Sequence, residues 1–467
     1  MSFFREGGSF MAENNENPLG TRPLPELLRQ FAVPSIVAML VSSLYNIVDQ
    51  IFIGQGIGYL GNAATNVAYP LTTICLAVAL LLGVGSGACY SLKLGQGRPE
   101  EAARIAGNAI TMMTVFGVLY LVLIQIFLCP MLMSFGATAE VFPFAESYTR
   151  ITACGMPLLI LTNGISKLAM ADGSPRYSML CMVVGAVVNC VLDPLCIFVW
   201  DMGIAGAAWA TVTGQLISLL LAVGYCPRFK HIRLERRHFL PHRGTCLHIA
   251  SLGMSSSINQ IAITFVQIVL NNSLTYYGGF SVYGQEIPLA VNGIVTKVNG
   301  LLMAVLIGIS QGSQPIIGFN YGAKQYARVR GIYRLSTQVN LLVSVAAFAL
   351  FQLIPGPIVS LFGDSDNVLY MEFAVKFMRI FLLMAAVNCV QMLSSTFFSA
   401  IGKPLKGTFL SLTRQVLFLV PLLLTLPLFF GIDGILFAAP AADFAAFLVS
   451  VLMVRHEMKM IRRLEAA

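Results

Sequence analysis

The chain is short of charged residues. Only 11% of its 467 residues are Asp, Glu, Lys or Arg, while 57% are hydrophobic. A soluble domain needs roughly twice that charged fraction to cover its surface, so a soluble enzyme or binding module is excluded. No stretch between the apolar runs is long enough to form a domain outside a membrane. The sequence therefore predicts a single integral membrane unit.

Several recognisable motifs are also missing. The N-terminal segment before the first apolar run has no apolar core of the signal-peptide type, and Met11 is a second possible start. No Walker-type phosphate loop is present, which argues against ATP hydrolysis. The ten cysteines are scattered without metal-ligand spacing, so we interpret them as small buried hydrophobic residues. We expect no cofactor beyond a coupling ion.

Long apolar runs fill most of the sequence. Runs of about 20 residues or more, the length of a membrane-spanning helix, recur twelve times. They lie near residues 28–54, 63–90, 105–129, 144–170, 177–200, 203–226, 247–277, 287–317, 331–355, 368–399, 405–430 and 433–455. An even number of spans places both termini on the same side. The predicted fold is all-α, with twelve transmembrane helices.

The basic residues indicate the orientation. With the N-terminus assigned to the cytoplasm, 24 of the 29 Lys and Arg fall on the cytoplasmic side and none in the outer loops. This is the distribution that the positive-inside rule requires, and it accounts for the net charge of +8 without nucleic acid as a partner. We predict a multi-pass protein of the plasma or inner membrane, with both termini cytoplasmic.

The two halves of the chain resemble each other. LAMADGSPRYSML matches FFSAIGKPLKGTFL, which aligns Gly173 with Gly402, and MGIAG (202–206) matches FGIDG (430–434). Two halves of the same orientation imply two six-helix bundles related by a pseudo-two-fold axis along the membrane normal. The predicted divisions are a cytoplasmic tail (1–26), the first bundle (27–226), a basic linker (227–246), the second bundle (247–455) and a second tail (456–467).

Two aspartates lie inside apolar spans. Asp49 follows VSSLYNIV, and Asp193 follows GAVVNCVL. A carboxylate at membrane depth costs at least ~2.5 kcal/mol on insertion scales, so it is retained chiefly for function. Asn189 shares a helix face with Asp193 because the two are four residues apart. Pro194 loosens the helix beside the carboxylate, although a capped and kinked helix end would show the same pattern.

Depth estimates indicate that these groups can meet. At ~1.5 Å per residue, Asp49 lies ~7 Å inside the outer end of its span, Asp193 ~10 Å and Thr211 ~12 Å. Asn163 is deeper by the same count. Two carboxylates a few Å apart favour holding one proton between them. Together with amide and hydroxyl oxygens, they would equally suit Na+.

Two further intramembrane charges have open interpretations. Asp443, in FAAPAADFAAF, is either a second ionisable site facing the cleft between the bundles or a polar group that packs helices. Lys297, in NGIVTKVNGLL, is a candidate buried cation that either pairs with a carboxylate or extends to the membrane surface. The second half has no counterpart of the Asp49 and Asp193 pair.

The chain resembles the MATE (multidrug and toxic compound extrusion) family of cation antiporters, in its bacterial branch. The resemblance rests on the first span with Pro34 and Asp49, on the Asn-x-x-x-Asp-Pro of the fifth span, and on the paired Gly-x-Pro segments after spans four and ten. It implies a cation site formed by Asp49, Asn163, Asn189, Asp193 and Thr211. It also implies that Pro34 is a proline at which the first helix bends when the site is protonated.

The sequence thus predicts a monomeric secondary antiporter rather than an enzyme. It would export organic cations or drugs in exchange for H+ or Na+ by alternating access, with membrane lipid as its surroundings. The alternatives are a lipid-linked saccharide flippase of the same superfamily and a membrane-embedded enzyme. No residue decides between H+ and Na+, and no linear motif indicates the natural substrate.

Overall fold

The computed structural model describes residues 17–360 and 368–466, and within these ranges all regular secondary structure is helical. The first half contains α1 (Pro18–Thr21), α2 (Leu24–Ile57), α3 (Tyr59–Gly95), α4 (Pro99–Ser134), α5 (Phe142–Ala171), α6 (Pro175–Pro194), η1 (Leu195–Val199) and α7 (Gly203–Val223). Two short turns of the linker follow, η2 (Cys226–Arg228) and η3 (Arg236–Phe239). Met11 lies outside the described residues.

The second half begins with α8 (Arg243–Gly278), α9 (Glu286–Gly322) and α10 (Tyr326–Leu353). It continues with α11 (Pro355–Ser360), α12 (Val368–Phe381), α13 (Ala385–Ala400), α14 (Pro404–Leu412), η4 (Thr413–Leu419), α15 (Val420–Phe430) and α16 (Ile432–Ala466). The helix α16 has no break near residue 455, so the residues predicted as a second tail continue the last helix through Ala466.

The described residues contain eleven helical segments long and apolar enough to cross a membrane, and a twelfth if the bent pair α12 and α13 is one span. Those two helices meet at an angle of 48°. Each segment coincides with one of the twelve predicted spans, and the ends differ by a few residues except in α16, which runs eleven residues past its predicted end. The predicted all-α transmembrane fold is therefore confirmed.

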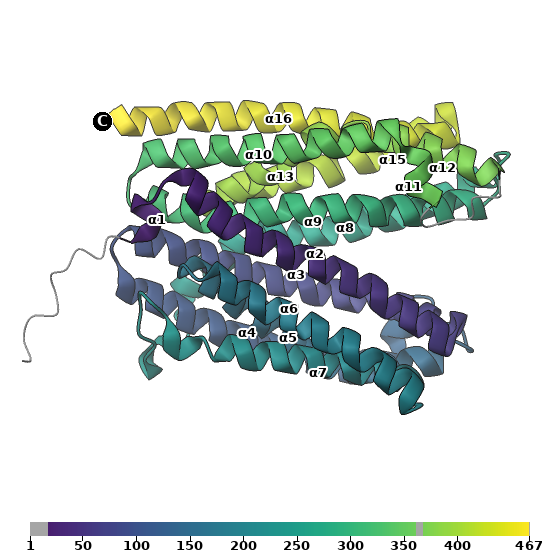
Figure 1. The fold of residues 1–467 in the computed structure, drawn as a ribbon, viewed down its shortest axis with the longest axis horizontal. Helices are drawn as coiled ribbons and strands as arrows, with labels where there is room; N and C mark the ends of the chain where they lie inside the picture. Colours follow the sequence, from purple (N-terminus) through teal and green to yellow (C-terminus); the bar gives the residue numbers. More distant parts are fainter. Residues whose placement is uncertain (1–16, 361–367, 467) are drawn as a thin grey trace, which may run out of the picture.

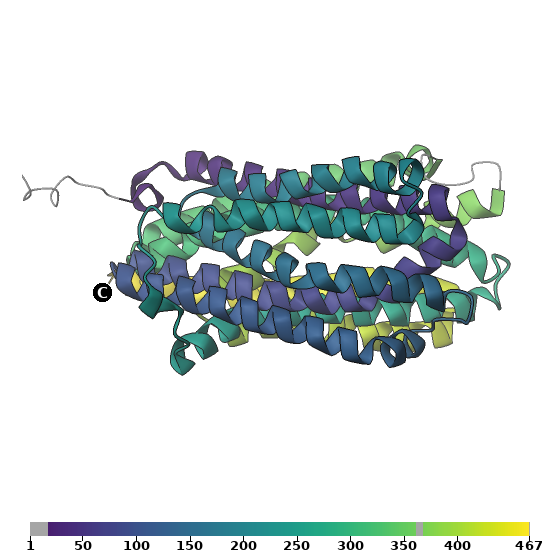
Figure 2. The same ribbon diagram turned by 90° about the horizontal axis from the view of Figure 1, so that it is seen from below.

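The helices form two bundles that lie side by side along the long axis (Figures 1 and 2). The helices α2 to α7 make the first bundle, and α8 to α16 the second, with α2 crossing obliquely between them (Figure 1). Equivalent turns join equivalent helices: Gly173 and Gly402 both have positive φ, at 86° and 77°, and each precedes a helix that starts with proline. Gly203 and Gly431 both have φ of 57°. The internal repeat is thus visible in the backbone.

The two bundles touch through glycines at the end of the molecule where the C-terminus and α1 lie, which we call the terminus end (Figure 1). A Cβ atom on Gly85 of α3 would lie 2.1 Å from the carbonyl oxygen of Ile249 in α8. On α9, a Cβ on Gly312 would lie 2.7 Å from the Cα of Ala32 in α2. Small residues let helix backbones approach closely. Farther along α9, toward what we call the far end, a Cβ on Gly293 would meet nothing within 4 Å.

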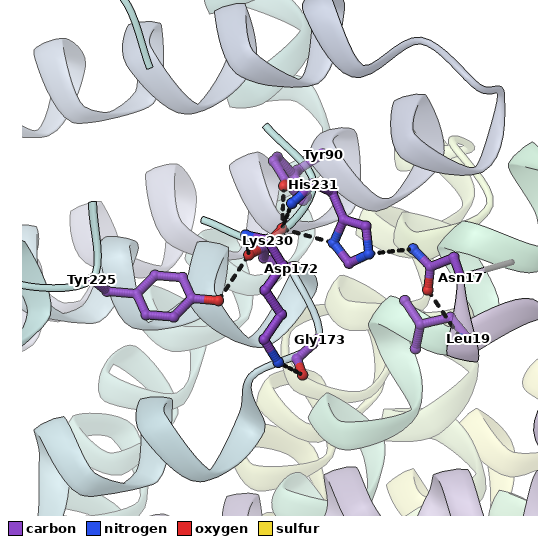
Figure 3. A network of polar contacts seen from close by, with 8 residues as sticks. All are labelled: Asn17, Leu19, Tyr90, Asp172, Gly173, Tyr225, Lys230 and His231. Atoms are coloured by element: carbon purple, nitrogen blue, oxygen red, sulfur yellow. Dashed lines mark hydrogen bonds and ion pairs between the residues drawn. The ribbon is translucent and has the colours of Figure 1, made fainter. Parts of the chain in front are cut away.

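The linker between the bundles is fixed to the first bundle by the carboxylate of Asp172, at the C-terminus of α5 (Figure 3). This carboxylate is fully buried and accepts hydrogen bonds from the hydroxyls of Tyr90 (2.6 Å) and Tyr225 (2.8 Å). It also accepts from the backbone N–H groups of Lys230 (2.7 Å) and His231 (3.3 Å), and lies 3.0 Å from His231 Nδ1. Burial raises the pKa of Asp172, but these hydrogen bonds outweigh it and hold the pKa below its ordinary value.

The short helix α1 bridges the two bundles at the terminus end. Asn17, at its N-cap, lies 3.2 Å from His231 Nε2 on the first-bundle side (Figure 3). The carbonyl of Leu19 accepts a hydrogen bond from the side chain of Asn320 in α9 (2.9 Å), and the carbonyl of Arg22 accepts one from Arg328 in α10 (2.7 Å). The segment therefore holds both bundles at this end.

We predict that Gly312→Ala destabilises the contact between the bundles, whereas Gly293→Ala on the same helix does not. The added methyl at position 312 overpacks against Ala32, at a cost of about 1–3 kcal/mol. The methyl at position 293 meets open space, and alanine is the better helix former by about 1 kcal/mol. Thermal unfolding of the purified variants in detergent checks this. A midpoint for Gly312→Ala at or above that of Gly293→Ala would contradict the close approach.

We also predict that Asp172→Asn lowers stability by about 1–3 kcal/mol, because an amide in this position leaves buried donors unpaired. The pKa of the carboxyl is depressed in the folded protein, so its contribution is complete above the ordinary value of about 3.9 and fades as pH falls below it. Thermal midpoints of wild type and variant should therefore differ by a constant amount from pH 5 to 7.5 and converge below about pH 4. A gap that shrinks already between pH 7 and 5 would refute this assignment.

Candidate functional site

Asp49 and Asp193 meet between α2 and α6. Their carboxyl groups are within hydrogen-bonding reach of each other although they are far apart in sequence. The side chain of Asp193 is fully buried, and Asp49 is half-buried. The two helices pack together because the second half of α2 docks on the end of α6, where the rings of Phe52 and Phe198 lie edge to face at 6.3 Å.

Asn189 and Thr211 complete the cluster. The side-chain amide of Asn189 donates to Asp193 Oδ1 at 3.2 Å and is 3.3 Å from Thr211 Oγ1. The Thr211 hydroxyl donates to the carbonyl of Ala207, one turn earlier on α7 (3.0 Å). Three helices thus bring four predicted residues into one layer, as their estimated depths indicated. Whether they bind an ion stays a prediction.

The cluster has oxygens without donors. Asp49 Oδ1, Asp193 Oδ2 and Asn189 Oδ1 are buried and have no hydrogen-bond partner. The other buried carboxylates in the described part of the chain have fixed partners. Asp172 accepts from hydroxyl and N–H groups, Asp443 pairs with Arg414, and Glu457 pairs with Lys403 and Lys406. The Asp49–Asp193 pair is therefore distinguished by buried carboxylate oxygens that have neither a cation nor a hydrogen-bond donor.

An apolar cluster of Ile53, Ile197 and Ala207 lies one turn nearer the far end. Each of its three members is four residues along the chain from Asp49, Asp193 or Thr211, with Ile197 in η1 just after α6, and all three are at most 4% exposed. Tyr148 of α5 packs against this cluster. Electrostatic interactions also link Tyr148 to both aspartates. This apolar layer separates the carboxylates from the far end, and only the helix spacing in the sequence could have indicated it.

Asn163 does not join this cluster. Its side chain donates to the carbonyl of Leu159 on its own helix (3.0 Å), and among the described residues no hydrogen bond connects it to the aspartates. The resemblance implied its inclusion, and the depth estimate placed it deeper. Its role in a cation site remains a prediction.

Pro34 and Pro194 differ in their local effects. The helix α2 continues through Pro34, which is buried. It lines a small cavity together with Lys167 of α5 and Gln311 of α9. Pro194 ends α6, and the wider turns of η1 follow at once. A hinge role for Pro194 remains a prediction.

The sequence did not single out Lys167. It was one of the 24 Lys and Arg assigned to the cytoplasmic side. Its side chain is buried within α5 and donates a hydrogen bond to Gln311 on α9, across the junction of the bundles. Its position in an apolar helix, four residues before the end of α5, was the available signal.

Two other expectations need correction. Lys297 is exposed on α9, not buried, although the nearby Asn292 is buried and donates to Asn271 Oδ1 at 2.8 Å. Its position around the helix explains this exposure. Lys297 lies on the same open face of α9 as Gly293 and Gly300. The packed face carries Val295 and Val298. Cys129 and Cys154 are likewise exposed rather than buried.

Asp443 forms an ion pair with Arg414, which lies in η4. Both side chains are largely buried, at 6% and 19% exposed. Within the described residues, no group of three or more His, Cys, Asp or Glu could hold a metal ion. A cation at the Asp49–Asp193 pair would therefore depend on amide and hydroxyl oxygens as well as the two carboxylates.

Comparisons with known proteins agree with this architecture. The family model described as MatE matches residues 34–195 and 255–424, that is, each half of the chain. The multidrug export protein MepA of Staphylococcus aureus (strain MSSA476) is 22% identical over 433 residues, which cover 92% of this chain and 94% of MepA.

Solved structures share the fold at a similar identity. One, described as the outward-facing conformation of a multidrug resistance MATE family transporter of the MOP superfamily, superposes with a TM-score of 0.89 at 22% identity, over 95% of this chain and 98% of that one. A MOP superfamily transporter from Pyrococcus furiosus, for which a reversed polarity of the binding pocket is described, gives the same TM-score, identity and coverage. Because the MatE model spans most of both halves, this chain belongs to the MatE family of membrane transporters and is not an enzyme.

Proposed function

We propose that this protein is a secondary active antiporter that exports organic cations in exchange for H+ or Na+. The observation that carries the proposal is the Asp49–Asp193 pair, two carboxyl groups in contact without a fixed cation. The MatE family and the name of the relative MepA, a multidrug export protein, support export as the activity. Both termini are proposed to be cytoplasmic, which makes the far end the outer one.

The pair suits reversible binding of a small cation. Two ionised carboxylates this close repel each other, so a proton or a cation between them relieves the repulsion. Hard cations such as Na+ prefer oxygen ligands, and Asp49 Oδ1, Asp193 Oδ2 and Asn189 Oδ1 are available. The apolar layer of Ile53, Ile197 and Ala207 limits exchange with the far end. A bound ion is therefore retained until the helices move.

The helix α2 is proposed to transmit ion binding to the bundle contact. Its second half carries Asp49, and its first half packs on α9, where Ala32 meets Gly312 and Ile36 meets Gly308. Pro34 lies between Ala32 and Ile36, and a proline removes one backbone hydrogen bond from the helix. A change at Asp49 is thus directly connected to the surface where α2 contacts the second bundle.

Alternating access requires the terminus end to open. The contacts that would then break are the Lys167–Gln311 hydrogen bond, the close glycine contacts and the bridge formed by α1. Opening would also expose apolar side chains, since Phe31 of α2 is buried in one cluster with Ile309 and Ile316 of α9.

A flippase for an anionic lipid-linked saccharide would call for a cationic central cavity. Lys297, exposed on α9, and Lys167 are the cations nearest to such a role, but Lys167 is bound to Gln311. The uncompensated pair of carboxylates favours a cationic substrate or coupling ion. Family membership excludes the membrane-embedded enzyme.

We predict that Asp49→Asn and Asp193→Asn each reduce ion-coupled export at least about tenfold, because one carboxylate fewer removes the charge that binds the ion. Efflux of a fluorescent organic cation from proteoliposomes, driven by a pH or Na+ gradient, measures this. The matched control is Asp201→Asn, an exposed far-end residue with φ of 48°, a conformation that asparagine tolerates.

Export that is unchanged in both variants at normal protein levels would refute the coupling site. The same assay with and without Na+ at fixed pH distinguishes the two coupling ions. A pH gradient that suffices in the absence of Na+ indicates H+, and a strict requirement for Na+ indicates the sodium ion.

We further predict that Asp443 stabilises the second bundle rather than coupling ions. Asp443→Asn should destabilise the protein by about 3–5 kcal/mol, because Arg414 is left buried without a counter-charge. The double variant Arg414→Met with Asp443→Leu should recover most of that loss and keep ion-coupled export. Thermal unfolding and proteoliposome efflux of the three proteins test this. A stable double variant without coupled export would show that Asp443 takes part in coupling.

A further inference from the structure

A basic hollow of about 230 Å³ lies at the terminus end, between the start of α4 and the linker. Its lining residues are Arg104, Arg237, His238, Leu240, Pro241 and His242. It is remote from the Asp49–Asp193 pair, which lies toward the far end. The proposed antiport does not account for it.

The hollow has a rigid frame. The side chain of Asn108 in α4 donates to the carbonyls of His238 (2.8 Å) and Leu240 (3.0 Å) and accepts from the N–H of His242 (2.7 Å). The hydroxyl of Thr111 donates to the carbonyl of Phe239 at 2.8 Å. A Cβ on Gly107 would lie 2.3 Å from the His238 carbonyl oxygen, so α4 and the linker are in direct backbone contact. The linker turn is therefore held in place before any ligand binds.

The charges around the hollow are unevenly satisfied. Arg237 pairs with Glu100 (3.1 Å) and Glu235 (2.8 Å), and His238 Nε2 lies 3.0 Å from Glu100. Glu101 forms ion pairs with Lys93 and Arg98. Arg104 is exposed and has no ion pair or hydrogen bond among the described residues. Of the two arginines that line the hollow, it is the one without a fixed partner, although it interacts electrostatically with the Glu100 carboxylate.

His242 adds a donor. Its Nδ1 accepts from the backbone N–H of Thr245 (3.4 Å) at the start of α8. In the neutral ring, an accepting Nδ1 leaves the proton on Nε2. Because His242 is exposed and lines the hollow, that N–H is available to an anion together with the Arg104 guanidinium.

The rim of the hollow is apolar. Leu240 and Leu247 are 70% and 71% exposed, and Phe239 is exposed beside them.

Farther along α4, Val115, Phe116, Val118 and Leu119 are exposed. With 36 residues, α4 is about 54 Å long, against about 30 Å for the apolar core of a bilayer. Arg104, in the second turn, therefore lies at headgroup level when the exposed apolar stretch lies among the acyl chains.

We propose that this hollow binds the phosphate of an anionic phospholipid headgroup from the terminus-side leaflet. Arg104 and His242 contact the phosphate, and Leu240 and Leu247 contact the acyl chains. A guanidinium presents several donors to a phosphate. A soluble phosphate would share the polar contacts but would leave the exposed leucines unused, so the apolar rim favours the lipid.

The test is lipid binding to the purified full-length protein, with phosphatidylglycerol compared with phosphatidylcholine by native mass spectrometry and by thermal stabilisation. We expect phosphatidylglycerol to bind preferentially to wild type, and Arg104→Gln to weaken this at least about tenfold, since a charge-assisted hydrogen bond is lost. Arg176→Gln is the matched control, because Arg176 is also exposed near the start of a helix and has no ion pair among the described residues. Arg104→Lys, which keeps the charge, should retain most of the preference.

A second arm separates the two sources of phosphate. Leu240→Ser should weaken phosphatidylglycerol binding and leave any effect of inorganic phosphate unchanged. Stabilisation by inorganic phosphate alone, equal to that by phosphatidylglycerol and unaffected by Leu240→Ser, would overturn the lipid assignment. Equal binding of both lipids, or equal loss in Arg104→Gln and Arg176→Gln, would overturn the site itself.

Discussion

An ionised carboxylate inside an apolar helix bundle has to be compensated, and the way each one is compensated organises this molecule. Asp172 is surrounded by hydroxyl and N–H donors, Asp443 has Arg414, and Glu457 has two lysines. The partners of these three carboxylates belong to the protein. Asp49 and Asp193 face each other instead. In the proposed antiport, the coupling ion would compensate them.

The contact between the two bundles depends on other kinds of interaction. It includes backbone approaches at Gly85, Gly308 and Gly312, one buried lysine bound to an amide, and the bridge of α1. Large apolar side chains also meet there, since Leu28 and Phe31 of α2 share one buried cluster with Ile316 of α9. The helix α2 takes part in both the carboxylate pair and this interface, so a movement of one is coupled to the other. In the proposed antiport, α2 would carry the effect of ion binding to the bundle contact.

The linker does more than connect the two bundles, because both of its ends are fixed to the first one. The Asp172 network fixes its first part to the first bundle, and Asn108 fixes its last part up to the start of α8. The second bundle therefore begins at a defined position on the first. The basic hollow lies at this joint, where a lipid headgroup would contact α4 and the start of α8 together.

Much of the architecture followed from the sequence. Twelve apolar runs predict the spans because a bilayer forces backbone hydrogen bonds into long helices, and the repeats predicted two bundles with matching glycine turns. The depth count placed Asp49, Asp193 and Thr211 in one layer, because helix rise is constant. The same reasoning was wrong for Lys297, whose side of α9 depends on which face packs. It also treated Lys167 as a loop charge. The sequence could not show its hydrogen bond to Gln311, because Gln311 lies in the other bundle.

The sequence by itself determined the number of spans, their order and the presence of two costly carboxylates, because these depend on local hydrophobicity and helical spacing. Only the tertiary structure decided which charges have partners: Asp443 with Arg414, Asp172 with the linker, and Asp49 with Asp193 alone. Such pairings join residues that are distant in sequence. They are fixed by how helices pack, and packing is a property of several segments at once rather than of any one of them.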